Sequence, residues 1–285
     1  MTKNRLILVE GIPGSGKTTI SNKIKEFLIE KGQKVVLYNE GELHPADMAW
    51  NALLPLEEYK ELIEKNKEHE DVISSNTIFE ENYAIVAYTK LGFRPKENEI
   101  MEIFENHEVY GGKVSLDVFK QIHLRRWKRF NEDMKPQKDQ ITIFECAFLQ
   151  NHIGEIVGDQ NITDEEFIKG YFRKLIDTVK DLNPKLIYLN QESVEETISR
   201  VAKERISDDK QKYPDWIDIV IDYYQNCKYG KKNNLKGYNS VITFLEKRKQ
   251  LEQKVINDLA VDKVVINNLN YDWDNVTKEV LKEFL

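Results

Sequence analysis

The feature that most constrains this chain is a glycine-rich segment of eight residues near its N-terminus. Residues 11–18 read GIPGSGKT and match the pattern G-x-x-x-x-G-K-[ST] at every fixed position. The apolar run of residues 6–9 precedes the segment, and an amphipathic stretch, residues 17–31, follows it. Glycines let successive backbone N–H groups converge on phosphate oxygens, and the helix N-terminus adds partial positive charge. A strand, a loop and a helix in this order predict a nucleoside triphosphate site.

The polar side chains of this loop have distinct expected roles. Lys17 can bridge the outer phosphates as a catalytic cation, and the Thr18 hydroxyl can bind Mg²⁺. We therefore expect ATP and Mg²⁺ as cofactors, although another nucleoside triphosphate stays open. The expected binding residues are contiguous: Gly11, Ile12, Pro13, Gly14, Ser15, Gly16, Lys17, Thr18 and Thr19.

Short apolar runs alternate with long amphipathic runs along the rest of the chain. Further strands are predicted at residues 34–38, 140–145, 185–189 and 263–266, with helices between them. Strands that alternate with helices form a mostly parallel sheet covered on both faces. The expected fold is therefore an α/β sandwich of three layers. Capping boxes at Thr163 with Glu166 and at Ser193 with Glu196 predict two helix starts.

One connection is much longer than an α/β unit requires. About one hundred residues separate the second and third predicted strands, whereas such links usually have about 2–6 residues. Helical spacing occurs at residues 57–66, 74–90, 98–106 and 115–134. We expect residues 44–134 to form a helical insertion that packs as a cap over the strand ends, within a single domain of residues 1–285.

The composition restricts the class of function. The 42 Lys and Arg against 49 Asp and Glu give a formal net charge of −7. An acidic chain is unsuited to coating nucleic acid or an anionic membrane, so neither is expected as a partner. Cys146 and Cys227 cannot form a disulfide framework. With no leader pattern and no apolar run of about 20 residues, we expect a cytoplasmic protein.

The layout resembles one branch of the P-loop proteins, the nucleoside and nucleotide kinases, including thymidylate kinases and deoxynucleoside kinases. The chain lacks an N-K-x-D guanine motif and an L-S-G-G-Q segment. The resemblance covers the five-strand framework and leaves the insertion without a counterpart. It implies a sheet order of 2-3-1-4-5 and a phosphotransferase that moves the γ-phosphate of ATP to a small acceptor.

Three carboxylates after the second strand compete for the role of catalytic base. Deoxynucleoside kinases carry a Glu just past this strand, usually followed by Pro, that deprotonates the acceptor hydroxyl. Glu40 falls on that position, although Gly41 replaces the proline. Glu42 and Asp47 stay open as alternatives, and His44 is also close enough in sequence to contact substrate.

Glu145 ends the apolar strand of residues 140–145, as expected of a Walker-B-like position, so Thr18 and Glu145 are the predicted metal ligands. The kinase group usually has Arg after this carboxylate, and this chain has Cys146. Two arginines on the helix of residues 115–134, Arg125 and Arg126, are candidates to replace it. His123 on the same helix is expected to be a packing residue.

Residues 193–212 resemble the lid of the same kinases, in which arginines close over the ATP phosphates. Arg200 and Arg205 fall on these positions and are predicted to be catalytic. The alternative is a surface helix on which Glu196 and Arg200 form an i,i+4 pair. The resemblance places the adenine at residues 267–270.

The identity of the acceptor is left open. Trp50 and Tyr110 are expected as pocket walls. The acidic residues favour a neutral or cationic acceptor over a strongly anionic one, although arginines of the insertion could reverse this preference. A nucleoside, a nucleotide and a sugar-containing compound all stay open. The second class of function is an ATPase switch that acts on a protein partner. The long helices, including residues 237–259, also leave a homodimer open.

Overall fold

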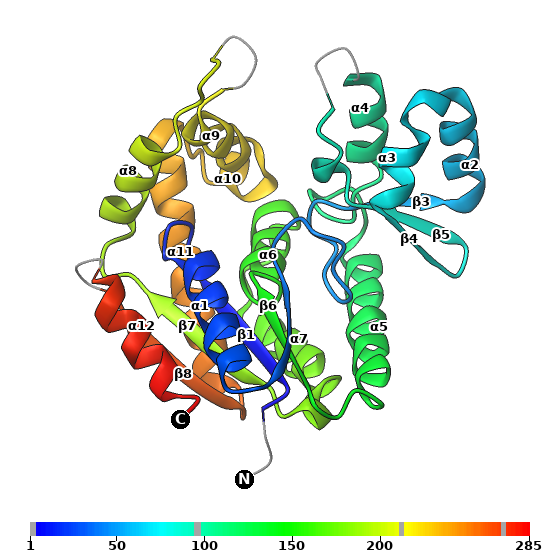
Figure 1. Ribbon diagram of the computed structural model, residues 1–285. Coiled ribbons are helices and arrows are strands. Elements are labelled where there is room, and N and C mark those ends of the chain that lie inside the picture. The colour runs from blue at the N-terminus through cyan, green and yellow to red at the C-terminus, as the bar shows by residue number, and fades with distance from the viewer. Residues whose placement is uncertain (1–3, 94–97, 211–213, 269–271) are drawn as a thin grey trace.

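The computed structural model describes residues 4–93, 98–210, 214–268 and 272–285 (Figure 1). Its main sheet has five parallel strands: β1 (Leu6–Gly11), β2 (Lys34–Tyr38), β6 (Gln140–Glu145), β7 (Lys185–Asn190) and β8 (Asp262–Asn267). Their spatial order is β2-β6-β1-β7-β8. Counted along the chain within this sheet alone, the order is the predicted 2-3-1-4-5. The labels run differently because three strands of a second sheet intervene in sequence.

The alternation of side chains along β1 explains the three layers. Leu6 and Leu8 belong to one core cluster, and Ile7 and Val9 belong to another, because successive side chains of a strand point to opposite faces. The Ile7 face packs on two helices, α1 (Lys17–Glu30) and α12 (Trp273–Lys282). The opposite face packs on three long helices: α5 (Leu116–Met134), α7 (Glu165–Asp177) and α11 (Gly237–Asp258).

The long connection after β2 is only partly helical. Four helices lie in or at the end of it: α2 (Leu56–Lys65), α3 (Glu70–Ser75), α4 (Asn98–Asn106) and α5, with short 3₁₀ turns at Lys67–His69 and Tyr88–Lys90. Three of the four predicted helices are confirmed, at residues 57–66, 98–106 and 115–134. Ser115 caps α5 by accepting the Val118 backbone N–H.

The predicted helix over residues 74–90 is wrong. This segment forms β4 (Thr77–Glu80) and β5 (Tyr83–Val86), which pair antiparallel and join β3 (Ala52–Pro55) in a second sheet of order β3-β5-β4. Glu81 in the two-residue turn has φ 51°. The β-branched and aromatic residues of the segment favour a hairpin, and burying one face against the insertion's own apolar cluster outweighs the helical spacing.

The helices after β6 complete the framework. They are α6 (Gln150–Ile153), a π-helical turn (η4, Gly154–Asp159), a 3₁₀ turn at Lys180–Leu182, α8 (Val194–Glu204), α9 (Trp216–Asn226) and α10 (Lys228–Lys232). Ser193 caps α8 as predicted, by accepting the Glu196 N–H. The cap of α7 is Asp164 and not Thr163, because the Asp164 carboxylate accepts the Phe167 N–H. Within the described residues, every helix is too short or too polar to cross a membrane.

Candidate functional site

The phosphate-binding loop joins β1 to α1 at the carboxyl edge of the main sheet. Gly14 has φ 80° and Gly16 has φ 90°, both in the left-handed region that glycine adopts without a steric penalty. Gly16 immediately precedes α1, so the loop leads its backbone N–H groups into the N-terminus of that helix. The local backbone therefore matches the requirement for binding phosphate.

Lys17 is buried at the start of α1, with 5% of its surface exposed. Its ammonium group donates to two carbonyl oxygens of the loop, Gly11 O at 3.0 Å and Ile12 O at 2.9 Å. Both acceptors are neutral. Phosphate oxygens would be stronger acceptors for the same ammonium group, since hydrogen bonds between charged partners are stronger than those to neutral carbonyls.

Thr18 and Glu145 meet at the sheet edge although 127 residues separate them in the chain. The Thr18 hydroxyl donates to Glu145 Oε1 at 2.8 Å, and Glu145 Oε2 accepts the backbone N–H of Glu40 at 3.3 Å. Glu145 reaches this place because β6 pairs in parallel with β1, with Val9 opposite it. A hydroxyl and a carboxylate side by side are the oxygen ligands that Mg²⁺ takes beside phosphates, so these residues fit the ion.

Glu40 approaches the same place from the loop after β2. It accepts hydrogen bonds from Trp50 Nε1 and Gln150 Nε2, both at 3.3 Å. Burial raises the pKa of Glu40 above its usual value, the charge of Lys17 lowers it, and the charge of Glu145 raises it again. The net upward shift brings the carboxyl closer to the range in which a general base is effective.

These groups open onto one cavity of about 1150 Å³. Besides the phosphate-binding loop, it is lined by six of the residues predicted from the sequence: Glu40, Trp50, Tyr110, Glu145, Arg200 and Arg205. The cavity therefore brings together residues from the loop after β2, the insertion, β6 and α8.

Five predicted substrate residues are not among those that line the cavity: Glu42, His44, Asp47, Arg125 and Arg126. Glu42 accepts the backbone and side-chain N–H groups of Asn39 and so stabilises a local turn. His44 Nδ1 accepts the backbone N–H groups of Ala46 and Asp47, and burial lowers the pKa of His44 to about 3. Of the three competing carboxylates, Glu40 is the one that lines the cavity.

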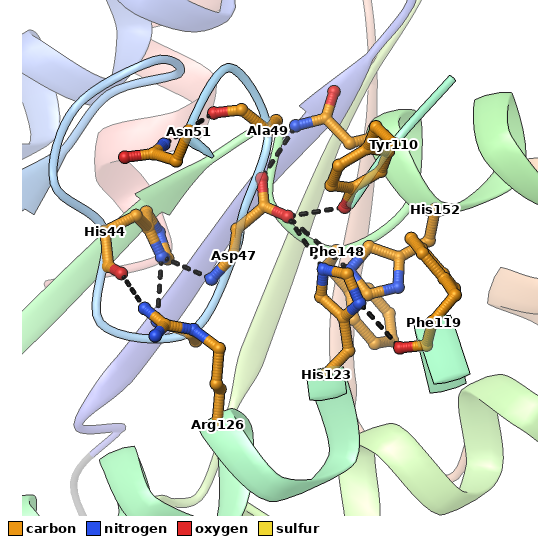
Figure 2. A network of polar contacts seen from close by, with 12 residues as sticks. His44, Asp47, Ala49, Asn51, Tyr110, Phe119, His123, Arg126, Phe148 and His152 are labelled. Carbon is orange, nitrogen blue, oxygen red and sulfur yellow. Dashed lines mark hydrogen bonds and ion pairs between the residues drawn. The ribbon is translucent and has the colours of Figure 1, made fainter. Parts of the chain in front are cut away.

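The two arginines of α5 predicted to contact substrate pair instead with carboxylates of the insertion. Arg126 is 2% exposed and places Nη1 at 2.7 Å from Glu80 Oε1. Its Nη2 donates to His44 O at 2.6 Å (Figure 2). Arg125 is half exposed and lies 3.4 Å from Glu81. An unpaired buried cation is costly, which explains why Arg126 pairs inside the protein. Neither arginine supplies a cation to the cavity.

A buried arginine that the sequence reasoning missed lines the cavity instead. Arg248 of α11 is 3% exposed, and its Nε lies 2.9 Å from Glu252 Oε1. Its Nη2 has no hydrogen-bond partner among the described residues. Burial lowers the pKa of Arg248, but Glu252 and other neighbouring groups, including Tyr224 and Tyr188, together raise it above its usual value. The detectable signal was a charge inside an apolar stripe formed by Val241, Phe244, Leu245 and Leu251.

The proposed lid helix, α8, lies directly against the phosphate-binding loop. Arg200 donates from Nη2 to Gly14 O at 2.8 Å and pairs through Nη1 with Glu204. The Arg205 guanidinium lies over the ring of Trp216, 5.3 Å from the ring centroid. Both arginines therefore line the cavity from one side of the loop.

The position predicted for adenine lies partly outside the described residues, since residues 269 and 270 are among those left out. Asn268 is buried, and its backbone N–H donates to Asn190 O at 3.1 Å. Trp273, at the start of α12, lies against the phosphate-binding loop, because a Cβ atom on Gly16 would come within 2.2 Å of its ring. Trp273 lines the cavity and was not predicted.

The remaining walls of the cavity are acidic and aromatic. The π-helical turn contributes Glu155 and Asp159, and other walls contribute Glu108, Asp222, Tyr223 and Tyr224. Burial raises the pKa of Glu155 to about 7, although Gln160 and the backbone N–H of Gly112 donate to its carboxyl. The Glu155 carboxyl would therefore lose its proton most readily when a cationic ligand lies beside it.

The loop, the Thr18–Glu145 pair and the parallel sheet define the class, a P-loop nucleotide-binding α/β protein. The sequence profile of a family described as "Chromatin associated protein KTI12" matches residues 5–75, about a quarter of the chain. A thymidylate kinase from Candida albicans is structurally similar with a TM-score of 0.39 and 11% identity, over 98% of this chain and 90% of that one. A search of curated proteins finds no match.

Proposed function

We propose that the protein is a phosphotransferase that uses ATP and Mg²⁺ to phosphorylate a hydroxyl group of a small molecule bound in the cavity. The observation that carries this proposal is the position of Glu40. Its carboxyl, with a raised pKa, faces the cavity beside Lys17 and the Thr18–Glu145 pair. A carboxyl in this position can take the proton of an acceptor hydroxyl that attacks the γ-phosphate.

The phosphate-binding side would be completed by the loop and the lid. Lys17 would bind the outer phosphates, and Thr18 and Glu145 would hold Mg²⁺, which neutralises phosphate charge when bound. Arg200 and Arg205 line the cavity on α8, and the guanidinium of each suits charge spread over several phosphate oxygens. Residues 193–210 of the predicted lid would exclude water from the reaction, and its residues 211 and 212 lie outside the described part of the chain.

The acceptor side would be formed by the insertion, α6, α9 and the π-helical turn. Trp50 and Tyr110 offer aromatic walls, and Glu155 and Asp159 offer negative charge. Such a surface favours a hydroxylated acceptor that carries an amino group, such as a sugar-containing compound with basic nitrogens, over an anionic nucleotide. If the acceptor also carries an anionic or carbonyl group, the guanidinium of Arg248 would bind it.

The test is turnover of Mg-ATP across a panel of aminated sugars, nucleosides and nucleotides. We expect an acceptor to stimulate ATP consumption, and Glu40→Gln to lower acceptor phosphorylation about 100-fold or more while leaving ATP binding intact. Glu57→Gln, on the exposed surface of α2, is the matched control.

An ATPase switch is the competing function. It would give slow hydrolysis that no acceptor accelerates, together with a stoichiometric protein partner that does accelerate it. That pair of results would contradict the phosphotransferase proposal.

A further inference from the structure

A second polar cluster lies outside the nucleotide cavity, where the insertion meets the α/β framework (Figure 2). It consists of Asp47 in the loop after β2, His123 on α5 and His152 on α6. One ligand atom from each residue lies within 4.8 Å of the other two. Asp47 is 4% exposed and both histidines are 0% exposed. Three residues that are far apart in sequence thus converge on one point that water does not reach.

The histidines direct unused nitrogen atoms toward the carboxylate. His123 Nε2 lies 3.5 Å and His152 Nε2 lies 3.8 Å from Asp47 Oδ1, and neither nitrogen has a hydrogen-bond partner among the described residues. Buried polar atoms are rarely left without a partner. These two nitrogens therefore point to a ligand between them and Asp47.

The opposite side of each ring is fixed by a hydrogen bond. His123 Nδ1 lies 3.0 Å from Phe119 O, and His152 Nδ1 lies 2.7 Å from the Tyr171 hydroxyl. A carbonyl oxygen only accepts, so in the neutral ring Nδ1 of His123 carries the proton and Nε2 carries the lone pair. Metal-binding histidines are oriented in this way by their second nitrogen.

The charge around the cluster also favours a cation. Asp47 Oδ1 accepts the Tyr110 hydroxyl at 2.5 Å and Oδ2 accepts Asn151 Nδ2 at 2.8 Å, and both hydrogen bonds favour the ionised carboxylate. The guanidinium of Arg126 is already paired with Glu80 at 2.7 Å. A buried carboxylate facing imidazole lone pairs is stabilised by a bound cation.

We propose that Asp47, His123 and His152 bind one divalent transition-metal ion, Zn²⁺ being the best match, and that this ion fastens the insertion to the framework. Ligand atoms about 2.0–2.2 Å from a Zn²⁺ ion lie roughly 3.3–3.6 Å from one another. The separation of 3.5 Å between His123 Nε2 and Asp47 Oδ1 already lies in this range, and that of 3.8 Å between His152 Nε2 and Asp47 Oδ1 reaches it with a shift of a few tenths of an ångström. Imidazole ligands select such ions over Mg²⁺, which prefers oxygen.

The first test is the metal content of the full chain. Protein dialysed against a chelator and then against Zn²⁺ in excess Mg²⁺ should retain one Zn²⁺ per chain, and its Tm should rise by about 5 °C. Co²⁺ in place of Zn²⁺ should give a visible absorption band from histidine coordination. If chelated wild-type protein takes up no Zn²⁺ and shows no Co²⁺ band, the proposal is overturned, and the cluster is a carboxylate–imidazolium pair.

Substitutions of the two histidines and of Tyr171 test whether the ion binds at this cluster. His123→Gln and His152→Gln should each lose the Co²⁺ band and at least 10-fold in Zn²⁺ affinity, and Tyr171→Phe, which changes only a supporting hydrogen bond, should weaken binding about 10-fold. His107→Gln is the matched control, because His107 lies in the same insertion and contacts Glu58 instead.

A second control separates this site from the one for Mg²⁺. Glu145→Gln should still retain the Zn²⁺ ion, since Glu145 belongs to the phosphate-binding side. Unchanged Zn²⁺ uptake in both histidine variants would overturn the proposal. If a histidine variant does not fold, the proposal is tested by the Zn²⁺ content of the wild-type protein and by the Zn²⁺ affinity of the Tyr171→Phe variant.

Discussion

Glu10 shows how single buried residues position the cavity. It lies on β1 with 0% exposure and accepts the backbone N–H groups of Phe148 at 2.7 Å and Gln150 at 3.0 Å. Gln150 in turn donates to Glu40.

Two cavity residues that are not glycine, Trp50 and Cys146, have φ of 60° and 65°. Backbone strain of this kind is often held at functional sites by the surrounding packing.

The titration of Glu10 predicts a pH dependence of stability. Burial raises the pKa of Glu10 to about 8, partly offset by the two backbone hydrogen bonds. The folded protein therefore binds this proton more tightly than the unfolded chain, so the contribution is present below about pH 4.5 and is lost as pH rises through 8. Relative to Glu10→Gln, the wild-type free energy of unfolding should fall by about 2–5 kcal/mol between pH 4.5 and 9. Urea unfolding at several pH values measures this, and parallel curves would contradict the prediction.

At the scale of elements, the phosphate-binding loop depends on the helices that pack against it. A Cβ atom on Gly14 would come within 2.1 Å of Val201 on α8, and one on Gly16 would meet Trp273 on α12 at 2.2 Å. The π-helical turn also contributes to the cavity wall, since Glu155 and Asp159, four residues apart on it, both line the cavity. Helices that are distant in sequence thus shape one site.

The substitution Gly14→Ala tests two constraints on that loop, the close packing of Val201 and the left-handed backbone conformation of Gly14. We expect it to lower the free energy of unfolding by about 1–3 kcal/mol and to weaken ATP binding, from the clash with Val201 and from the left-handed φ of 80°. Adding Val201→Ala should restore the part caused by the clash and leave the backbone part. Urea unfolding and ATP titration of both variants provide the measurement, with Val201→Ala alone as control. No recovery in the double variant would show that α8 is not the limiting contact.

At the scale of the whole molecule, the insertion has a core of its own. The apolar residues of β3, β5, α2 and α4 form a cluster separate from those on the two faces of the main sheet. Figure 1 shows this part standing to one side of the framework, with α5 beside the framework. The ion pair between buried Arg126 and partly exposed Glu80 connects α5 to β4. Such a separate cluster can open locally while the main sheet stays folded.

Native-state hydrogen exchange should resolve this difference. Amides of β3, β4 and β5 should exchange through an opening with a lower free energy than amides of β1, β6 and β7, because a small cluster buries less apolar surface. Mass spectrometry of exchanged peptides at several denaturant concentrations measures both openings. Equal opening free energies in the two sheets would mean that the protein unfolds as one unit.

Much of the framework followed from local patterns, and the errors have physical causes. The five strands and most helices are short-range features of apolar spacing and capping, so they were predictable. The hairpin within residues 74–90 was not predictable in this way. Its two strands pair with each other and with β3, and this long-range pairing decides between hairpin and helix. Asp47 and Arg126 lie outside the cavity lining for a related reason: the partners that hold them, Tyr110 and Glu80, are distant in sequence.

The sequence by itself determined the phosphate-binding loop, its flanking strand and helix, and the carboxylate at the end of β6, because each depends on neighbouring residues. Only the tertiary structure decided which carboxylate faces the cavity, that Arg248 lines it, and that His123 and His152 converge on Asp47. These outcomes depend on helix packing and on burial of charge. A pattern of adjacent residues does not specify which distant side chain will satisfy a buried charge, and that choice sets the chemistry of both sites.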